Sequence, residues 1–162
     1  MRSYEERAKD FIKQIFPYLD GCDDEHEGRE WAVLAFNHDY NRKVIYSHGM
    51  TRYALITSDY VVKVDYAQTR WGNSEDEMEV YEEAVADGFD YLFTKISRYE
   101  YMGKKFYIMP RIYGIGKKFY DADEYMTEEE CDWVWEHICD LHNQNYGWKN
   151  GHVVIFDYAA RR

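Results

Sequence analysis

The sequence has no stretch that looks like a membrane span or a secretory leader. It never approaches the roughly 18 consecutive apolar residues that a transmembrane helix requires. The amino-terminal segment MRSYEERAKDFIKQIF is charged and amphipathic and has no apolar core, so we expect no signal peptide. The three cysteines, Cys22, Cys131 and Cys139, form no CxxC pair, which indicates reduced thiols. We therefore expect a cytoplasmic protein.

Basic residues are too few for a nucleic-acid or membrane partner. The chain has 20 Lys and Arg against 31 Asp and Glu, which gives a formal net charge of -11. Such a charge repels the phosphates of nucleic acids and of anionic lipids. It fits a soluble protein, or one that presents an acidic face to a basic partner. By charge alone it would also suit an acidic mimic that occupies a nucleic-acid-binding protein.

Proline is rare, and nothing suggests a flexible linker. Only 2 prolines occur among 162 residues, and the sequence has no Gly/Ser-rich stretch, repeat or low-complexity tract. With 46% hydrophobic residues and 19% aromatics, a chain of this length can bury one core. We therefore expect it to fold.

Helical and β-type patterns follow one another along the chain. Apolar residues at helical spacing predict a first helix over residues 4–18, which Pro17 and the acidic stretch after it should end. Residues 29–36 fit either a short helix or a strand. The next patterns predict strands over 43–49, 51–57 and 59–66, followed by a helix over 73–88 that Asn73 or Ser74 caps and Gly88 ends. A hairpin is predicted over 93–112, with its turn at 102–104. The last patterns predict a helix from the Thr127–Glu130 capping box to about Leu141, a loop over 143–151 and a strand over 152–158.

The order of these elements and the spacing of three polar residues resemble protein-kinase-like folds. Antiparallel strands with one inserted helix indicate an α+β fold, and their order matches the small lobe of kinases followed by the beginning of the large lobe. In DLHNQN, Asp140 precedes Asn145 by five residues, as in the catalytic loop D-L-x-x-x-N. Asp157 lies twelve residues after Asn145, in the place of the D-F-G aspartate, beyond a hairpin that turns at 149–151. The loop is most similar to those of aminoglycoside-phosphotransferase-like kinases and of small kinase-like proteins from bacteria and their phages.

The resemblance implies a site for ATP. Lys63, in VVKV, resembles the strand lysine that holds the α- and β-phosphates. Glu77 is expected to pair with Lys63, because apolar residues follow it at helical spacing and place it on the buried side of its helix. Glu79 is the alternative, but its helical neighbours are acids on a solvated face.

The same resemblance implies Mg2+ and a catalytic acid. Asn145 and Asp157 would bind magnesium, which needs only one or two protein carboxylates. Asp140 would accept the proton of the acceptor hydroxyl or orient it, so that Asp140, Lys63 and Glu77 form the expected catalytic set. The nucleotide would further contact Gly49, in the place of the glycine-rich loop, and Met109 and Arg111, at the adenine-contacting hinge.

Several positions depart from the kinase pattern. Ile138 and Cys139 stand where kinases have His and Arg before the catalytic aspartate. The D-F-G triplet reads Asp157-Tyr158-Ala159, in which tyrosine can fill the role of phenylalanine, whereas alanine restricts a turn that glycine permits. Gly49 is the one glycine of its loop, so phosphate binding by backbone N–H groups is less assured.

The resemblance covers residues 44–159 and implies three segments. These are an N-terminal helical extension over 1–43, a kinase-like small lobe over 44–118 and a truncated large lobe over 119–162. The extension should pack against the small lobe or replace missing large-lobe surface. Only five residues follow Asp157, so we expect no activation segment.

Two functions are compatible with these features. One is a minimal ATP-dependent phosphotransferase whose acceptor is a protein or a small molecule. The other is a pseudokinase-like binding module that acts through a partner protein. A truncated large lobe would leave apolar surface for such a partner, or for a second copy of the chain in a homodimer. Small size and acidity would suit a bacteriophage protein that acts in the cytoplasm of a bacterial host.

Overall fold

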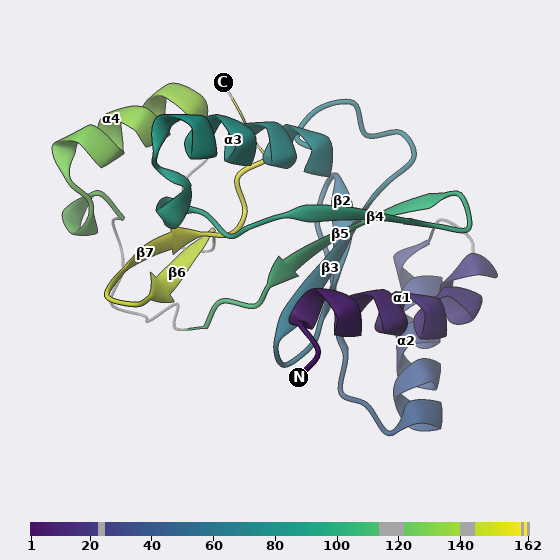
Figure 1. Ribbon diagram of the computed structural model, residues 1–162. Helices are drawn as coiled ribbons and strands as arrows, with labels where there is room; N and C mark the ends of the chain where they lie inside the picture. Colours follow the sequence, from purple (N-terminus) through teal and green to yellow (C-terminus); the bar gives the residue numbers. More distant parts are fainter. Residues whose placement is uncertain (23–24, 114–121, 140–144, 160, 162) are drawn as a thin grey trace. The chain divides into compact units, whose positions relative to one another are not determined.

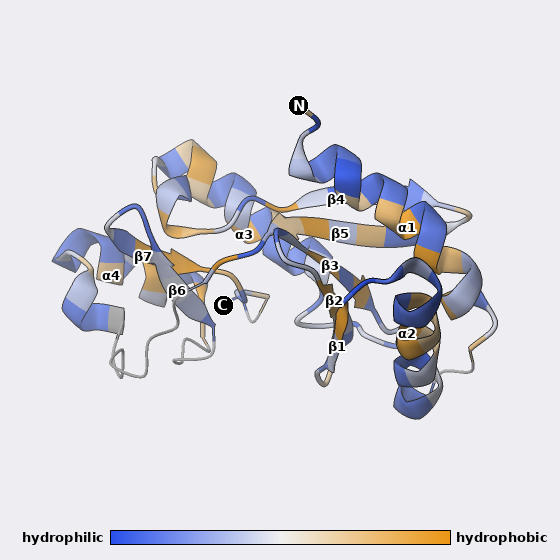
Figure 2. Ribbon diagram, turned by 90° about the horizontal axis from the view of Figure 1, so that it is seen from below, coloured by the Kyte–Doolittle hydropathy of each residue, from blue (hydrophilic) through white to orange (hydrophobic). Residues whose placement is uncertain are grey.

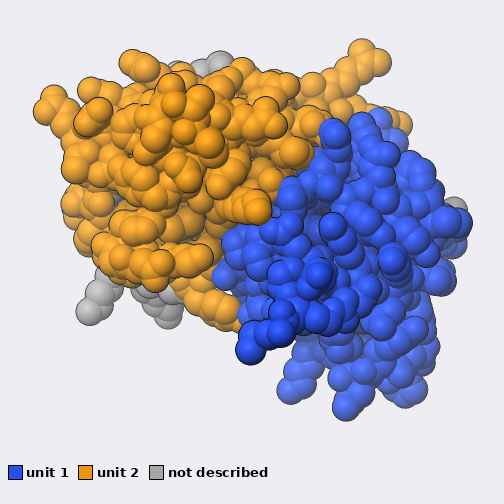
Figure 3. Space-filling view, in the orientation of Figure 1, with its two compact units in different colours: residues 1–67, 97–111 blue, residues 68–96, 112–162 orange. Residues whose placement is uncertain are grey.

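The computed structural model consists of two compact units (Figure 1; Figure 3). Unit 1 holds residues 1–67 and 97–111, and unit 2 holds residues 68–96 and 112–162. None of the helices in the described part of the chain is long and apolar enough to cross a membrane. The structure describes all residues except 23–24, 114–121, 140–144, 160 and 162.

Unit 1 is built on a five-stranded antiparallel sheet with the strand order β1-β2-β3-β5-β4. Between β4 and β5, Met102 (φ 52°) and Gly103 (φ 78°) form a left-handed two-residue turn, which suits the twist of a hairpin. The predicted strands and hairpin are thereby confirmed. The strands are β1 (Ile45–His48), β2 (Arg52–Ile56), β3 (Tyr60–Asp65), β4 (Ser97–Tyr101) and β5 (Lys104–Pro110).

Helix α1 (Tyr4–Asp20) includes Pro17, as in the predicted helix over 4–18, and extends beyond the predicted end at Tyr18 to Asp20. Pro17 lies in the last turn, where its missing N–H removes a single helical hydrogen bond and does not end the helix at once. Phe16 and Leu19, on either side of the proline, are buried in the core and hold this turn in place. The helix ends instead at Gly21.

Helix α2 (His26–Tyr40) includes residues 29–36, for which the sequence allowed a helix or a strand. It packs against α1 and β1, while α1 lies along β3, β4 and β5, so the two helices cover one face of the sheet (Figure 2). The N-terminal extension therefore packs against the sheet, as one of the two expectations had it. Side chains alternate between the faces of a strand, which places Val62 and Val64 in this core and Lys63 on the opposite face.

Unit 2 contains the helix α3 (Ser74–Asp87), whose predicted ends are confirmed. Asn73 and Asp76 form a capping box at its start, and Gly88 ends it in the left-handed conformation (φ 83°). Acids in the first turn favour this start, because they face the positive end of the helix dipole. The other elements of unit 2 are η1 (Asp90–Leu92), η2 (Ala122–Tyr125), α4 (Glu128–His137), β6 (Tyr146–Lys149) and β7 (His152–Ile155).

Two boundaries in unit 2 differ from the sequence predictions. The loop predicted over 143–151 contains β6, which pairs with β7 in a hairpin turning at Asn150 (φ 52°) and Gly151 (φ 82°). Helix α4 ends at His137 rather than near Leu141, because Ile138 is extended and forms a β-bridge with Arg161. The first difference arises from pairing within one hairpin, and the second from pairing with a segment farther along the chain.

The fold is α+β, as predicted. A five-stranded antiparallel sheet, with α3 inserted between β3 and β4 in the chain, is the arrangement expected for a kinase-like small lobe. Helix α4 and the β6–β7 hairpin follow in the order expected for the beginning of a large lobe.

Candidate functional site

Three successive backbone N–H groups connect three of the residues predicted for the site in unit 2. Phe156 and Asp157 both donate to the carbonyl oxygen of Asn145, at 2.8 and 3.2 Å. Tyr158 donates to the Oε2 atom of Glu77 at 3.0 Å. The structure thereby brings Glu77, Asn145 and Asp157 into one hydrogen-bond network, although they lie far apart in the sequence.

Glu77 is completely buried, on the apolar side of α3 that also buries Val80 and Ala84. A buried carboxylate is costly unless hydrogen bonds satisfy it, and the N–H of Tyr158 supplies one. Glu79, the alternative partner for Lys63, is instead exposed and forms a salt bridge with Arg161. The burial that helical spacing predicted for Glu77 is confirmed.

Tyr158 anchors the segment that follows Asp157. Its side chain is fully buried, and its ring meets that of Phe93 edge-on, with the ring centroids 5.0 Å apart. The hydroxyl donates to the carbonyl oxygen of Thr94 at 2.6 Å, which satisfies both buried groups. Thr94 in turn donates its N–H to the carbonyl oxygen of Ile155 at 2.9 Å. The tyrosine therefore fills an apolar position and adds a hydrogen bond that phenylalanine could not make.

The chemistry of Asn145 and Asp157 suits a magnesium ion. Asn145 is buried and Asp157 is half-buried, and the backbone bond between them holds the two residues together. Both side chains offer oxygen atoms, the ligands that Mg2+ prefers. Asp140, the predicted catalytic acid, lies outside the described residues. Within the described part of the chain, His, Cys, Asp and Glu side chains form no cluster of three or more that could hold a metal.

Lys63 lies in unit 1, in the middle of β3. Its register neighbours are Ala54 on β2 and Tyr107 on β5, and only 7% of it is exposed. A buried ammonium group keeps its charge only beside an anion or a hydrogen-bond acceptor. The position of Lys63 therefore suits a residue that works against a negatively charged partner.

The two residues predicted for the hinge lie at the end of β5 in unit 1. Met109 is buried and pairs in register with Val61 of β3. Arg111 donates its N–H to the carbonyl oxygen of Asp59 at 3.0 Å and its Nη1 to that of Thr57 at 2.8 Å. Arg111 therefore braces the β2–β3 turn, a structural role that the sequence did not reveal.

Gly49 has little support for a role in phosphate binding. Its N–H donates to the carbonyl oxygen of Arg52 at 2.9 Å and closes the β1–β2 hairpin. An added Cβ would lie 3.6 Å from the same oxygen, an ordinary contact, so the backbone does not require glycine at this position. This amide is used within the hairpin and is not presented to a phosphate.

Sequence reasoning missed Arg161. Its guanidinium pairs with Glu79 and, at 3.3 Å, with Glu83 on the exposed side of α3. No local pattern could reveal a pair separated by about eighty residues. Because the partners are partly solvated, each pair contributes at most about 1 kcal/mol to stability.

No protein-family model matches the chain, and no curated protein matches its sequence. Four chains of solved structures match its fold. One is the Lpg2603 kinase of Legionella pneumophila bound to IP6, with 17% identity and a TM-score of 0.49 over 76% of this chain and 49% of that one. Another is APH(2'')-IIa in a ternary complex with streptomycin and ATP, with 11% identity and a TM-score of 0.39. This match covers 80% of this chain and 71% of that one. The chain thus spans about half the length of the first of these proteins.

Proposed function

We propose that the chain is a small kinase-like protein that binds ATP with Mg2+ and transfers a phosphoryl group to a hydroxyl of a protein or a small molecule. The observation that carries the proposal is the hydrogen-bond network of residues 156–158. It gathers Glu77, Asn145 and Asp157, the residues that the kinase pattern assigns to one site.

Each residue has a defined task in this proposal. Lys63 would hold the α- and β-phosphates, and Glu77 would orient Lys63 by charge. Asn145 and Asp157 would hold the metal, which when bound neutralises charge on the transferred phosphoryl group. Asp140 would accept or orient the acceptor hydroxyl. Met109 and Arg111 would contribute to nucleotide contacts through their backbone or neighbours. Gly49, whose N–H is used within its hairpin, would contribute only through its neighbours.

A thermal melt with ATP, with and without Mg2+, tests the proposal. Ligand at a hundredfold excess over its Kd stabilises the folded state by about 2.7 kcal/mol, which raises Tm by about 5–10 °C for a chain of this size. We expect this shift to require Mg2+, to vanish in Asp157→Ala and to persist in Asp132→Ala, an exposed acid of α4. No shift in the wild type at millimolar ATP would refute the proposal.

A pseudokinase-like module that acts through a partner protein is the second candidate. It is favoured by the closed β1–β2 hairpin, in which Gly49 donates to Arg52 rather than facing a ligand. Transfer from radiolabelled ATP separates the two functions. Phosphorylation that Asp140→Ala abolishes supports the first. Magnesium-dependent ATP binding without transfer supports the second and directs attention to partners, including a second copy of the chain.

A further inference from the structure

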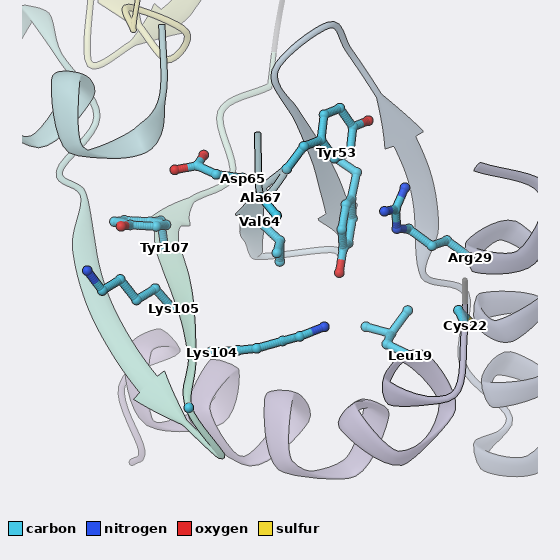
Figure 4. Close-up of a pocket in the computed structure, with 12 residues that line it drawn as sticks. Leu19, Cys22, Arg29, Tyr53, Val64, Asp65, Ala67, Lys104, Lys105 and Tyr107 are labelled. Carbon is cyan, nitrogen blue, oxygen red and sulfur yellow. The ribbon is translucent and has the colours of Figure 1, made fainter. Parts of the chain in front are cut away.

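A cavity of about 410 Å3 lies in unit 1, and none of the residues predicted for the nucleotide site lines it (Figure 4). Its size is within the range of about 300–1,000 Å3 that is typical of small-molecule sites. The cavity lies where two strands separate. β3 pairs with β2 as far as Asp65, but with β5 only as far as Lys63. The end of β3 and the start of β5 therefore diverge and leave room between them.

Apolar and aromatic groups form much of the cavity wall. Leu19 lines it from the end of α1, while Tyr53 and Val64 line it from β2 and β3. Burial raises the pKa of Tyr53, so its hydroxyl stays protonated and can donate a hydrogen bond. These walls favour a ligand with an apolar or planar part.

The charged groups of the cavity are mainly positive. Arg29, Lys104 and Lys105 line it together with a single acid, Asp65. This local excess of positive charge contrasts with the net charge of -11 for the chain. An anion attracted here would be repelled by much of the remaining surface, so the positive charge of the cavity is local rather than part of a general basic patch.

The cations approach the cavity from two sides. In Figure 4 the ammonium end of Lys104 points into the space between Tyr53 and Leu19, and the Arg29 guanidinium points toward Tyr53 from the side of α2. Arg29 is buried, with its guanidinium carbon 4.9 Å from the ring centroid of Tyr53 and 5.1 Å from that of Tyr66. Cation–π contacts hold it in place, so this side of the site is formed before any ligand binds.

We propose that this cavity, which we call the β3–β5 pocket, binds a small organic phosphate. The phosphate would lie against Lys104 and Arg29, and the organic part would lie against Leu19, Tyr53 and Val64. A phosphate carries up to two negative charges and several acceptor oxygens, which matches cations on two sides better than a single carboxylate does. The proposal does not depend on nucleotide binding at Lys63.

Titration calorimetry with phenyl phosphate, inorganic phosphate and phenol tests the site on the full chain. We expect phenyl phosphate to bind more tightly than inorganic phosphate, and phenol to bind least. Lys104→Gln should raise the Kd of phenyl phosphate about tenfold, because it removes one charge-assisted contact. Lys13→Gln, which removes an exposed lysine of α1 outside the pocket, should leave the Kd unchanged.

Cys22 lines the pocket and reports where the ligand binds. Phenyl phosphate should slow the modification of Cys22 by N-ethylmaleimide, followed by mass spectrometry. It should not slow the modification of Cys139, which is exposed in unit 2. Asp157→Ala should retain phenyl phosphate binding whether or not it binds ATP, which separates this proposal from the proposed function.

Three results would overturn the proposal. The first is no binding of either phosphate at millimolar concentration. The second is wild-type affinity in both Lys104→Gln and Lys105→Gln. The third is binding of phenol as tight as that of phenyl phosphate, which would make the pocket an apolar site without anion recognition.

Discussion

The backbone N–H of Tyr158 donates to the buried carboxylate of Glu77 at 3.0 Å and ties the segment after Asp157 to helix α3. A carboxylate has two oxygens and can accept from several donors at once. Glu77 can therefore keep this bond and also take a cation, as its proposed pairing with Lys63 requires. The Glu77 side chain would then hold the segment after Asp157 in place and also take part in the proposed nucleotide site.

Two replacements of Glu77 distinguish the effect of its charge on stability from the effect of its hydrogen bond. Glu77→Gln keeps an oxygen that can accept from Tyr158, whereas Glu77→Ala leaves that buried N–H without this acceptor. We expect Glu77→Ala to be less stable than Glu77→Gln by about 1–3 kcal/mol in urea unfolding. Faster hydrogen exchange of the Tyr158 amide in the alanine variant alone would locate the effect. Equal stability of the two variants would show that the bond contributes nothing.

Removing the hydroxyl of Tyr158 should weaken unit 2. In Tyr158→Phe the ring still packs against Phe93, but the buried carbonyl of Thr94 loses the hydroxyl of Tyr158 as a donor. We expect a loss of about 1–2 kcal/mol in the free energy of unfolding. Tyr40→Phe, at an exposed tyrosine of α2, is the matched control and should change stability by less than about 0.5 kcal/mol. A similar loss in both variants would contradict the role of the Thr94 bond.

Replacing either of two glycines by alanine should change the stability in opposite directions, because both have space for a Cβ but their backbone conformations differ. A Cβ added at Gly151 or at Gly21 meets no atom within 4 Å, but Gly151 has φ +82° and Gly21 has φ -87°. Gly151→Ala should destabilise the β6–β7 hairpin by about 1–2 kcal/mol. Gly21→Ala should stabilise by about 0.4–1 kcal/mol, because it restricts only the unfolded chain. Thermal melts measure both, and changes of the same sign would show that backbone strain is not the cause.

Acid should weaken unit 1 through His26. The pKa of His26 is lowered below its ordinary value of 6.5, first by desolvation and then by the stacked His48 and the nearby Arg29. The hydroxyl groups of Tyr46 and Tyr66 also face the His26 ring. In the window between the two pKa values the unfolded chain binds more protons, so stability falls as the pH drops through it. Urea unfolding against pH should show this slope, and His26→Gln should reduce it. An unchanged slope in His26→Gln would contradict this assignment.

Local signals predicted the parts of the fold that local interactions form. The start and end of α3 follow from Asn73 and Gly88, and the burial of Glu77 follows from helical spacing alone. The alternation of β3 likewise separates Lys63 from the core formed with α1 and α2. In each case the determining residues lie within one or two turns of the feature, so a single sequence contains the information.

Most features that the sequence did not reveal depend on distant partners. Residues 146–149 are an exception. Their composition reads as a polar loop, but they pair with the adjacent β7 in a hairpin whose turn the kinase resemblance predicted at 149–151. Arg161 and Arg111 gain their roles from segments far away along the chain. Helix α1 extends beyond its predicted end at Tyr18 because packing, rather than propensity, holds its last turn. The roles of Lys63, Asn145 and Asp157 in binding ATP and Mg2+, and the role of Asp140 in catalysis, stay predictions.

The bond between Glu77 and Tyr158 also bears on how the protein forms during translation. The two residues are 81 positions apart, so α3 leaves the ribosome long before its buried acid can meet that donor. Closing so long a loop is slow compared with forming a hairpin. The acid of the nascent helix therefore stays in water, and unit 2 cannot complete its hydrogen-bond network until residue 158 has been made.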